Sequence, residues 1–219
     1  MDHKDDKISV KKFNSEEIIS FRYNHLYQIS SPKLEELCEL LCLDRKGGGA
    51  FRDNLLNAGL LLGKGLKDLT SEFNKKLIAV IGIPRGGILL AEGICRSIPK
   101  SSLFYTNDGK NSDPKKTLLL HKNFLQKCQL IIVVDTVVDL GTTAERTLRF
   151  LVQNYKENVI ILISLITSVD GAYRLEKTFP KLSHYTSMIE KKTLWIKVTK
   201  NINRRIIPKI GDVGELTSK

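Results

Sequence analysis

The stretch LIIVVDTVVDLGTTAERTL, residues Leu130–Leu148, decides the fold. It begins with five consecutive apolar residues, Leu130–Val134, and such a short unbroken run is typical of a strand buried on both faces of a parallel sheet. Two acids follow, Asp135 and Asp139, and a Gly-Thr-Thr turn then opens a run that is compatible with a helix. Parallel strands deliver their carboxyl ends to the crevice where α/β proteins bind ligands, so we expect a functional site here.

The turn at residues 141–143 has the chemistry of a phosphate-binding site. Backbone N–H groups at a helix start lack intrahelical partners and attract anions, and the hydroxyls of Thr142 and Thr143 add further donors. The neighbouring carboxylates suit a ligand that also carries sugar hydroxyls. The alternative interpretation is a buried strand followed by an ordinary helix N-terminus without a ligand. The segment is not a P-loop, because no Gly-Lys-Ser/Thr follows, and it is not a GxGxxG motif.

A second strand–turn–helix pattern lies earlier in the chain. Leu77–Ile83 is a β-rich run, Pro84–Gly87 interrupts it, and Ile88–Ser97 follows a helical pattern. A turn of this kind again leaves N–H groups facing a ligand, here beside Arg85. Because an arginine can bind pyrophosphate through two parallel hydrogen bonds, we predict an anion site at this residue.

The rest of the chain alternates strand and helix patterns, which is typical of βαβ units and a parallel sheet with helices on both faces. A capped helix is expected from Pro32, with an apolar stripe at Leu34, Leu37, Cys38, Leu41 and Cys42. Further helices are expected at about 51–66, 142–155 and 169–179. Strands are expected at 102–105, 117–120, 159–166 and 194–199, the last as an edge or hairpin strand.

Charge and cysteine content narrow the class of partner. The chain has 219 residues, with 35 lysines and arginines against 24 acids, and a net charge of +11. This excess favours anionic partners, and the absence of a long block of like charge or an RNA-binding signature favours small anions over nucleic acid. The four cysteines have no zinc-ligand spacing, which predicts buried, reduced thiols and no metal ligands.

The length suits one α/β domain, expected at residues 27–219, behind a polar N-terminal arm at residues 1–26. The N-terminus lacks the apolar core of a signal peptide, and no apolar run is long enough to span a membrane. We therefore expect a cytoplasmic protein without a membrane partner.

Two segments resemble a known family. DTVVDLGTT, residues 135–143, resembles the phosphoribosyl-pyrophosphate loop of type I phosphoribosyltransferases, and RIIPKIGDVGE, residues 205–215, resembles the base-binding tail of uracil phosphoribosyltransferases. The match runs from about Tyr27 to the C-terminus. It implies the type I phosphoribosyltransferase fold, with an N-terminal helical segment and a small β hood or arm.

The resemblance implies transfer of a phosphoribosyl group from 5-phosphoribosyl 1-pyrophosphate to uracil, giving UMP and pyrophosphate in pyrimidine salvage. Arg85, Asp135 and Asp139 would support catalysis. The sugar-phosphate site would comprise Arg85, Asp135, Thr136, Val137, Val138, Asp139, Leu140, Gly141, Thr142, Thr143 and Asp212. The base would contact Ile206, Gly211, Asp212 and Val213. The implied cofactor is Mg²⁺, bound mainly through the substrate pyrophosphate, and the implied assembly is a homodimer or a higher homo-oligomer.

Several positions depart from the family pattern. Lys209 replaces a glycine, Leu216 an arginine, Leu140 a hydroxyl residue and Thr142 a glycine. Asp139 stands where uracil enzymes usually have a small apolar residue, and related purine and orotate enzymes carry an acid there. Two alternatives follow: the same fold acting on another base, and a non-catalytic regulator that senses nucleotides or binds RNA.

Overall fold

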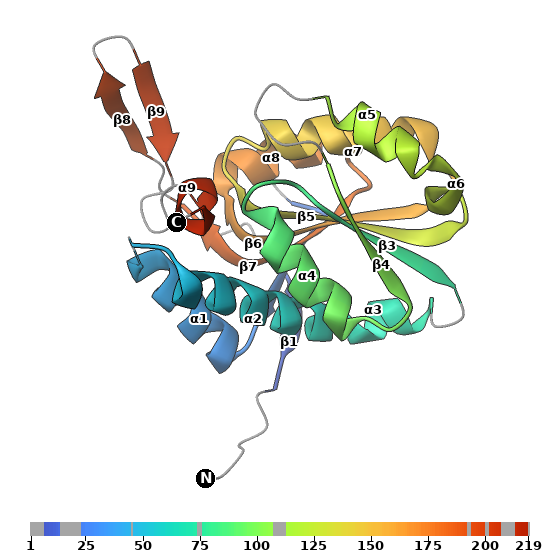
Figure 1. Cartoon of the computed structure of the whole chain (residues 1–219), viewed down its shortest axis with the longest axis horizontal. Helices are drawn as coiled ribbons and strands as arrows, with labels where there is room; N and C mark the ends of the chain where they lie inside the picture. The colour runs from blue at the N-terminus through green and yellow to red at the C-terminus, as the bar shows by residue number, and fades with distance from the viewer. Residues whose placement is uncertain are drawn as a thin grey trace.

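A seven-stranded sheet forms the centre of the computed structural model, with strand order β1-β2-β7-β6-β5-β3-β4 (Figure 1). The structure describes residues 7–13, 23–44, 46–73, 76–106, 113–191, 194–199, 202–206 and 213–218. The strands are β1 Ser9–Lys12, β2 Leu26–Ser30, β3 Leu77–Gly82, β4 Ser101–Tyr105, β5 Cys128–Val138, β6 Val159–Ser168 and β7 Ser183–Glu190. Every pair is parallel except β1–β2, so the predicted parallel α/β sheet is confirmed.

Helices cover both faces of this sheet (Figure 1). On one face lie α1 Pro32–Leu43, α2 Gly49–Gly65, α3 Lys67–Ser71 and α4 Gly87–Ser97. On the other lie α5 Pro114–Leu120, α6 Lys122–Leu125, α7 Thr142–Asn154 and α8 Val169–Thr178. After the sheet, β8 Leu194–Thr199 and β9 Ile202–Ile206 form a separate antiparallel hairpin, and α9 Val213–Thr217 follows. The hairpin matches the expected small β arm.

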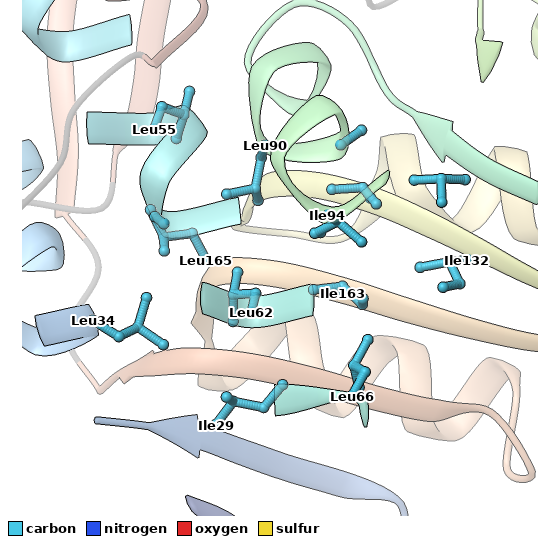
Figure 2. Close-up of a cluster of buried hydrophobic side chains, with 14 of the residues drawn as sticks. Ile29, Leu34, Leu55, Leu62, Leu66, Leu90, Ile94, Ile132, Ile163 and Leu165 are labelled. Atoms are coloured by element: carbon cyan, nitrogen blue, oxygen red, sulfur yellow. The ribbon is translucent and has the colours of Figure 1, made fainter. Parts of the chain in front are cut away.

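The apolar core consists of two layers, one on each face of the sheet. Along β5, Ile132 and Val134 point into the layer under α1, α2 and α4, whereas Ile131 and Val133 point into the layer under α7 and α8. This alternation follows the two-residue period of a strand, and both faces are buried as the unbroken apolar run predicts. Figure 2 shows the first layer, where leucines of the helices meet isoleucines of the strands.

Helix α1 forms as its sequence predicts. The hydroxyl of Ser31 accepts a hydrogen bond from the backbone N–H of Leu34 at 3.2 Å, and Pro32 occupies the first turn. All five residues of the expected apolar stripe are buried: Leu34, Leu37, Cys38, Leu41 and Cys42. The four cysteines are free thiols, and three of them are buried.

One expected strand is wrong, and three strands of the central sheet were not expected. The segment Thr117–Leu120 belongs to helix α5, because the Asp113 side chain caps the backbone N–H of Lys115 at 2.9 Å and Pro114 begins the first turn. Strands β1, β2 and β7 lack a clear apolar pattern, and β1 lies inside the segment expected to be a polar arm. Among the described residues, no helix is both long and apolar enough to cross a membrane.

The polar character of β7 comes from a buried hydrogen-bond network. His184 Nε2 lies 2.9 Å from Ser164 Oγ and 3.2 Å from Thr167 Oγ1, and Thr167 donates to Thr186 at 3.1 Å. All four side chains are buried. Burial lowers the pKa of His184 to about 3, so the ring is neutral and its hydrogen bonds satisfy the strand's polar groups.

We expect His184 to make stability depend on pH. The unfolded chain binds a proton at this residue below about pH 6.5 and the folded chain only near pH 3, so stability falls as the pH falls below 6.5. His184→Gln removes this contribution. The stability advantage of the wild type over the variant should shrink by roughly 2 kcal/mol between pH 7.5 and pH 5, measured by urea unfolding. An advantage that stays constant over this range would contradict the expectation.

Candidate active site

The central motif continues as strand beyond its first acid. Asp135 pairs with Ser164 of β6, and Val137 and Val138 pair with the next residues of that strand. The three residues after Asp135 are β-branched and favour extended backbone, which explains why the turn begins only at Asp139. Asp135 therefore lies within β5, and Asp139 is the first residue beyond it.

Helix α7 begins with the predicted open turn. Gly141 adopts a left-handed conformation with φ of 70°, and the helix runs from Thr142 without a side-chain cap on its N-terminus. A Cβ atom at Gly141 would lie 3.2 Å from Cγ of Leu175, so the turn has little room for another residue type. Because no side chain caps the first turn, its N–H groups can donate to an anion.

The start of α8 contacts the residues that lead into this turn. The Ser168 hydroxyl donates to the backbone carbonyl of Asp139 and also accepts from the backbone N–H of Gly171 at 2.9 Å. A Cβ atom at Gly171 would overlap the Asp139 carbonyl oxygen. The position of Asp139 is thus set by contacts with the neighbouring strand–helix junction.

The first turn of α7 also carries an acid whose charge is balanced. The Glu145 carboxylate forms salt bridges with Arg149 at 2.6 Å and with Arg174 of α8 at 2.5 Å. Burial by itself raises the pKa of Glu145, but the hydrogen bonds from the two arginines outweigh it and the pKa lies below its usual range. Two guanidinium groups therefore offset a carboxylate in the first turn of α7, and this cluster was not anticipated from the sequence.

The Arg85 turn packs directly against the end of β5. The backbone N–H of Ile83 donates to the Val134 carbonyl at 2.8 Å, and a Cβ atom at Gly87 would lie 2.7 Å from the same oxygen. The Pro84–Arg85 peptide bond is cis, and the Arg85 side chain is exposed. None of the salt bridges found among the described residues involves Arg85. Arg85 therefore lies in the turn after β3, where an anion is expected.

The C-terminal helix α9 lies against the Arg85 turn. A Cβ atom at Gly86 would lie 2.9 Å from Cγ1 of Val213 and 3.2 Å from the hydroxyl of Thr136. The structure therefore brings together the Arg85 turn, strand β5 and the predicted base-binding tail. Ile206 ends β9, and Gly211 and Asp212 lie outside the described residues. Of the predicted base contacts, only Val213 is placed at the site.

Two buried polar groups on β5 show the electrostatic character of the site. Burial raises the pKa of Asp135 to about 7, although hydrogen bonds from the backbone N–H groups of Val137 and Thr136 act in the opposite direction. The Thr136 hydroxyl is buried and has no hydrogen-bond partner among the described residues. In the same parts of the chain, no group of three or more His, Cys, Asp or Glu side chains could hold a metal ion.

Residues 64–216 match the family model described as uracil phosphoribosyltransferase, which is more than half of the chain. The chain belongs to the uracil phosphoribosyltransferase family. The matched region contains the Arg85 turn, the whole of β5 and α7, and the tail through Leu216. The resemblance inferred from residues 135–143 and 205–215 is therefore confirmed at the level of the family.

Individual members of the family are distant from this chain. It is 27% identical over 146 residues to the uracil phosphoribosyltransferase of Thermosipho melanesiensis, and the match covers 65% of each chain, slightly less than two thirds. It is 21% identical over 217 residues to that of Caldanaerobacter subterraneus subsp. tengcongensis, covering 88% of this chain and 97% of the relative. Family membership therefore rests on the match of residues 64–216 to the family model.

A solved structure supports the fold. The AQ2163 protein of Aquifex aeolicus superimposes with a TM-score of 0.68 at 17% identity, covering 88% of this chain and 97% of that chain. At this identity the likeness concerns the fold alone. It covers a larger share of the chain than the family model does.

We expect Asp135 to destabilise the folded protein when it ionises. The unfolded chain releases this proton near pH 3.8 and the folded chain near pH 7, so the free energy of unfolding falls as the pH rises between these values. Asp135→Asn removes the effect. Relative to wild type, the variant should gain roughly 2–3 kcal/mol between pH 5 and pH 8 in urea unfolding. A relative stability that does not change with pH would show that the carboxyl is already ionised at pH 5.

Proposed function

We propose that the chain transfers the phosphoribosyl group of 5-phosphoribosyl 1-pyrophosphate to uracil, giving UMP and pyrophosphate. The observation that carries the proposal is the meeting of three segments at the carboxyl ends of β3 and β5, where Gly86 lies between Thr136 and Val213. Arg85 and Asp135 are the immediate neighbours of two of these residues. Membership of the uracil phosphoribosyltransferase family supports the same reaction.

Each segment has a separate task in this reaction. The 5′-phosphate would bind the free N–H groups and hydroxyls at Gly141–Thr143, at the positive end of α7. Asp135, once ionised, would accept hydrogen bonds from ribose hydroxyls, and Asp139 would do the same from the adjoining turn. The sugar is then held between two fixed backbone segments, which places its anomeric carbon between the base and the leaving group.

The reaction is a displacement at that carbon. The bond to the pyrophosphate oxygen breaks, its electron pair leaves with the pyrophosphate, and a ring nitrogen of uracil forms the new bond and loses its proton. Arg85 would stabilise the departing pyrophosphate through charge-assisted hydrogen bonds. Mg²⁺ bound mainly by the pyrophosphate would neutralise part of the same charge, which suits a site without a three-residue metal cluster among its described residues.

The base itself needs a direct test. We propose uracil as the base because of the family membership and the resemblance of the tail, whereas Asp139 favours a related base. The decisive assay offers uracil, other pyrimidines and purines separately, with phosphoribosyl pyrophosphate and Mg²⁺, and detects nucleotide and pyrophosphate. Formation of UMP from uracil, and of no nucleotide from the other bases, supports the proposal. Formation of a nucleotide from another base instead would identify that base as the substrate. No turnover with any base would favour the nucleotide-sensing or RNA-binding regulator.

We also propose the assembly and location that the resemblance implies. A homodimer or higher homo-oligomer in the cytoplasm would suit an enzyme of pyrimidine salvage. The net charge of +11 favours an anionic substrate such as phosphoribosyl pyrophosphate.

Arg85→Ala should lower turnover without unfolding the protein. The side chain is exposed, so its removal leaves the core unchanged, but it deletes a contact made chiefly to the departing pyrophosphate. We expect kcat to fall by the equivalent of about 2–4 kcal/mol. Arg96→Ala is the control, because Arg96 is an exposed arginine on helix α4, which follows the Arg85 turn, and it pairs with Glu92 at 2.7 Å. Equal turnover in the two variants would remove Arg85 from the mechanism.

Asp135→Asn and Asp139→Asn should weaken binding of phosphoribosyl pyrophosphate more than binding of uracil. The carboxylate would accept hydrogen bonds from two ribose hydroxyls, and the amide that replaces it accepts hydrogen bonds less strongly. We expect an affinity loss on the order of tenfold for the sugar phosphate, measured by calorimetric titration above pH 7.5. Asp53→Asn, at an exposed position of α2, is the control. The assignment fails if both site variants bind the sugar phosphate as the control does.

A further inference from the structure

The two ends of the domain touch at one point beside the candidate active site. Gly47 lies in the connection between α1 and α2, and a Cβ atom there would overlap the backbone carbonyl oxygen of Leu216 and lie 3.1 Å from its Cα. Helix α9 also contacts α2, and Figure 1 places it beside the start of that helix. The connection and the tail are therefore in direct backbone contact.

The connection is shaped to make this approach. A carboxylate oxygen of Asp44 accepts from the backbone N–H groups of Lys46 at 2.8 Å and Gly47 at 3.0 Å. Gly47 has φ of 72°, a conformation that favours glycine. Both its conformation and its lack of a side chain allow the tail to lie against it.

Helix α9 is held in the core by two side chains on one of its faces. Val213 and Leu216 are separated by three positions and are both buried in the apolar layer that contains α1 and α2. Val213 lies against Gly86, next to Arg85, and Leu216 lies against Gly47. The two buried side chains anchor α9 to the layer that also contains α1 and α2.

We propose that Gly47 and Leu216 are positioning residues that fix the base-binding tail against the N-terminal helices. The inference rests on the proposed function, because it concerns the segment that would hold the base. Asp212 is joined directly to Val213, so the seat of α9 restricts where the predicted base contacts can lie. Gly47 itself lies outside residues 64–216, the part that the family model matches.

The chain provides a matched pair of glycines for the test. Gly47 and Gly48 both have positive φ, 72° and 90°, so an alanine is strained at either position. Only at Gly47 does the added Cβ meet the tail, because a Cβ at Gly48 has no atom within 4 Å. We expect Gly47→Ala to raise the KM for uracil by about tenfold or more relative to Gly48→Ala, with phosphoribosyl pyrophosphate affinity within about twofold. Equal KM values in the two variants would overturn the proposal.

Leu216 tests the position of α9 through a second contact, its side chain buried in the apolar layer. Leu216→Ala should raise the KM for uracil, and Leu216→Met should restore most of the loss because methionine fills a similar volume. Combining Gly47→Ala with Leu216→Ala should raise KM by less than the product of the two single effects, since both loosen the same short helix. A loss of thermal stability without a change in KM would show a structural role only and would overturn positioning.

Hydrogen exchange of residues 213–218 separates this inference from the proposed function. If the wild type converts no base, the proposed function fails, and exchange still tests the contact. Faster exchange of this segment in Gly47→Ala than in Gly48→Ala supports the contact between Gly47 and the tail. Equal exchange in the two variants overturns it, whatever reaction the chain catalyses.

Discussion

The structure depends on the burial of β5 between two apolar layers. Its side chains alternate between the layer under α4 and the layer under α7, and the residues from Leu130 to Val134 are inaccessible to solvent. Burying side chains of this size contributes roughly 1.5–3 kcal/mol each. Because the strand is held from both faces and by β3 and β6 at its edges, its carboxyl end is a rigid point from which Asp135 and the α7 turn project.

The same burial sets the chemistry of the site. Asp135 continues the strand, so its carboxyl leaves bulk water with the apolar residues before it, and only backbone N–H groups of Val137 and Thr136 offset the loss. A carboxyl held in this way resists ionisation until a partner donates hydrogen bonds to it. Ribose hydroxyls are such partners, and the buried Thr136 hydroxyl beside Gly86 adds one more polar group to this part of the strand. In the proposed reaction, binding of the sugar and ionisation of Asp135 would therefore be coupled.

Sequence periodicity predicted the elements whose pattern reflects burial, and it failed where polar residues are buried or local caps decide. The apolar run of β5 and the stripe of α1 identified both elements. Strand β7 was missed because His184 and its hydroxyl partners satisfy each other's hydrogen bonds inside the sheet. The apolar-rich segment Thr117–Leu120 was predicted as a strand, but the Asp113 cap makes it part of helix α5. The turns at Arg85 and Gly141 were predicted individually, but the contact of the Arg85 turn with β5 depends on strand order. The contact of Gly47 with Leu216 has no signal in the sequence.

The tail shows why a site of this kind needs the whole chain. Strands β3 and β5 place the Arg85 turn beside Asp135, and the segment that would bind the base meets this turn only at Val213. That segment becomes part of the core only through Val213 and Leu216, which share an apolar layer with the N-terminal helices. The approach of Gly47 to Leu216 therefore links the α1–α2 connection directly to the tail. In the proposed reaction the sugar phosphate would depend on the turns after β3 and β5, whereas the base would depend in addition on the N-terminal helices that hold α9.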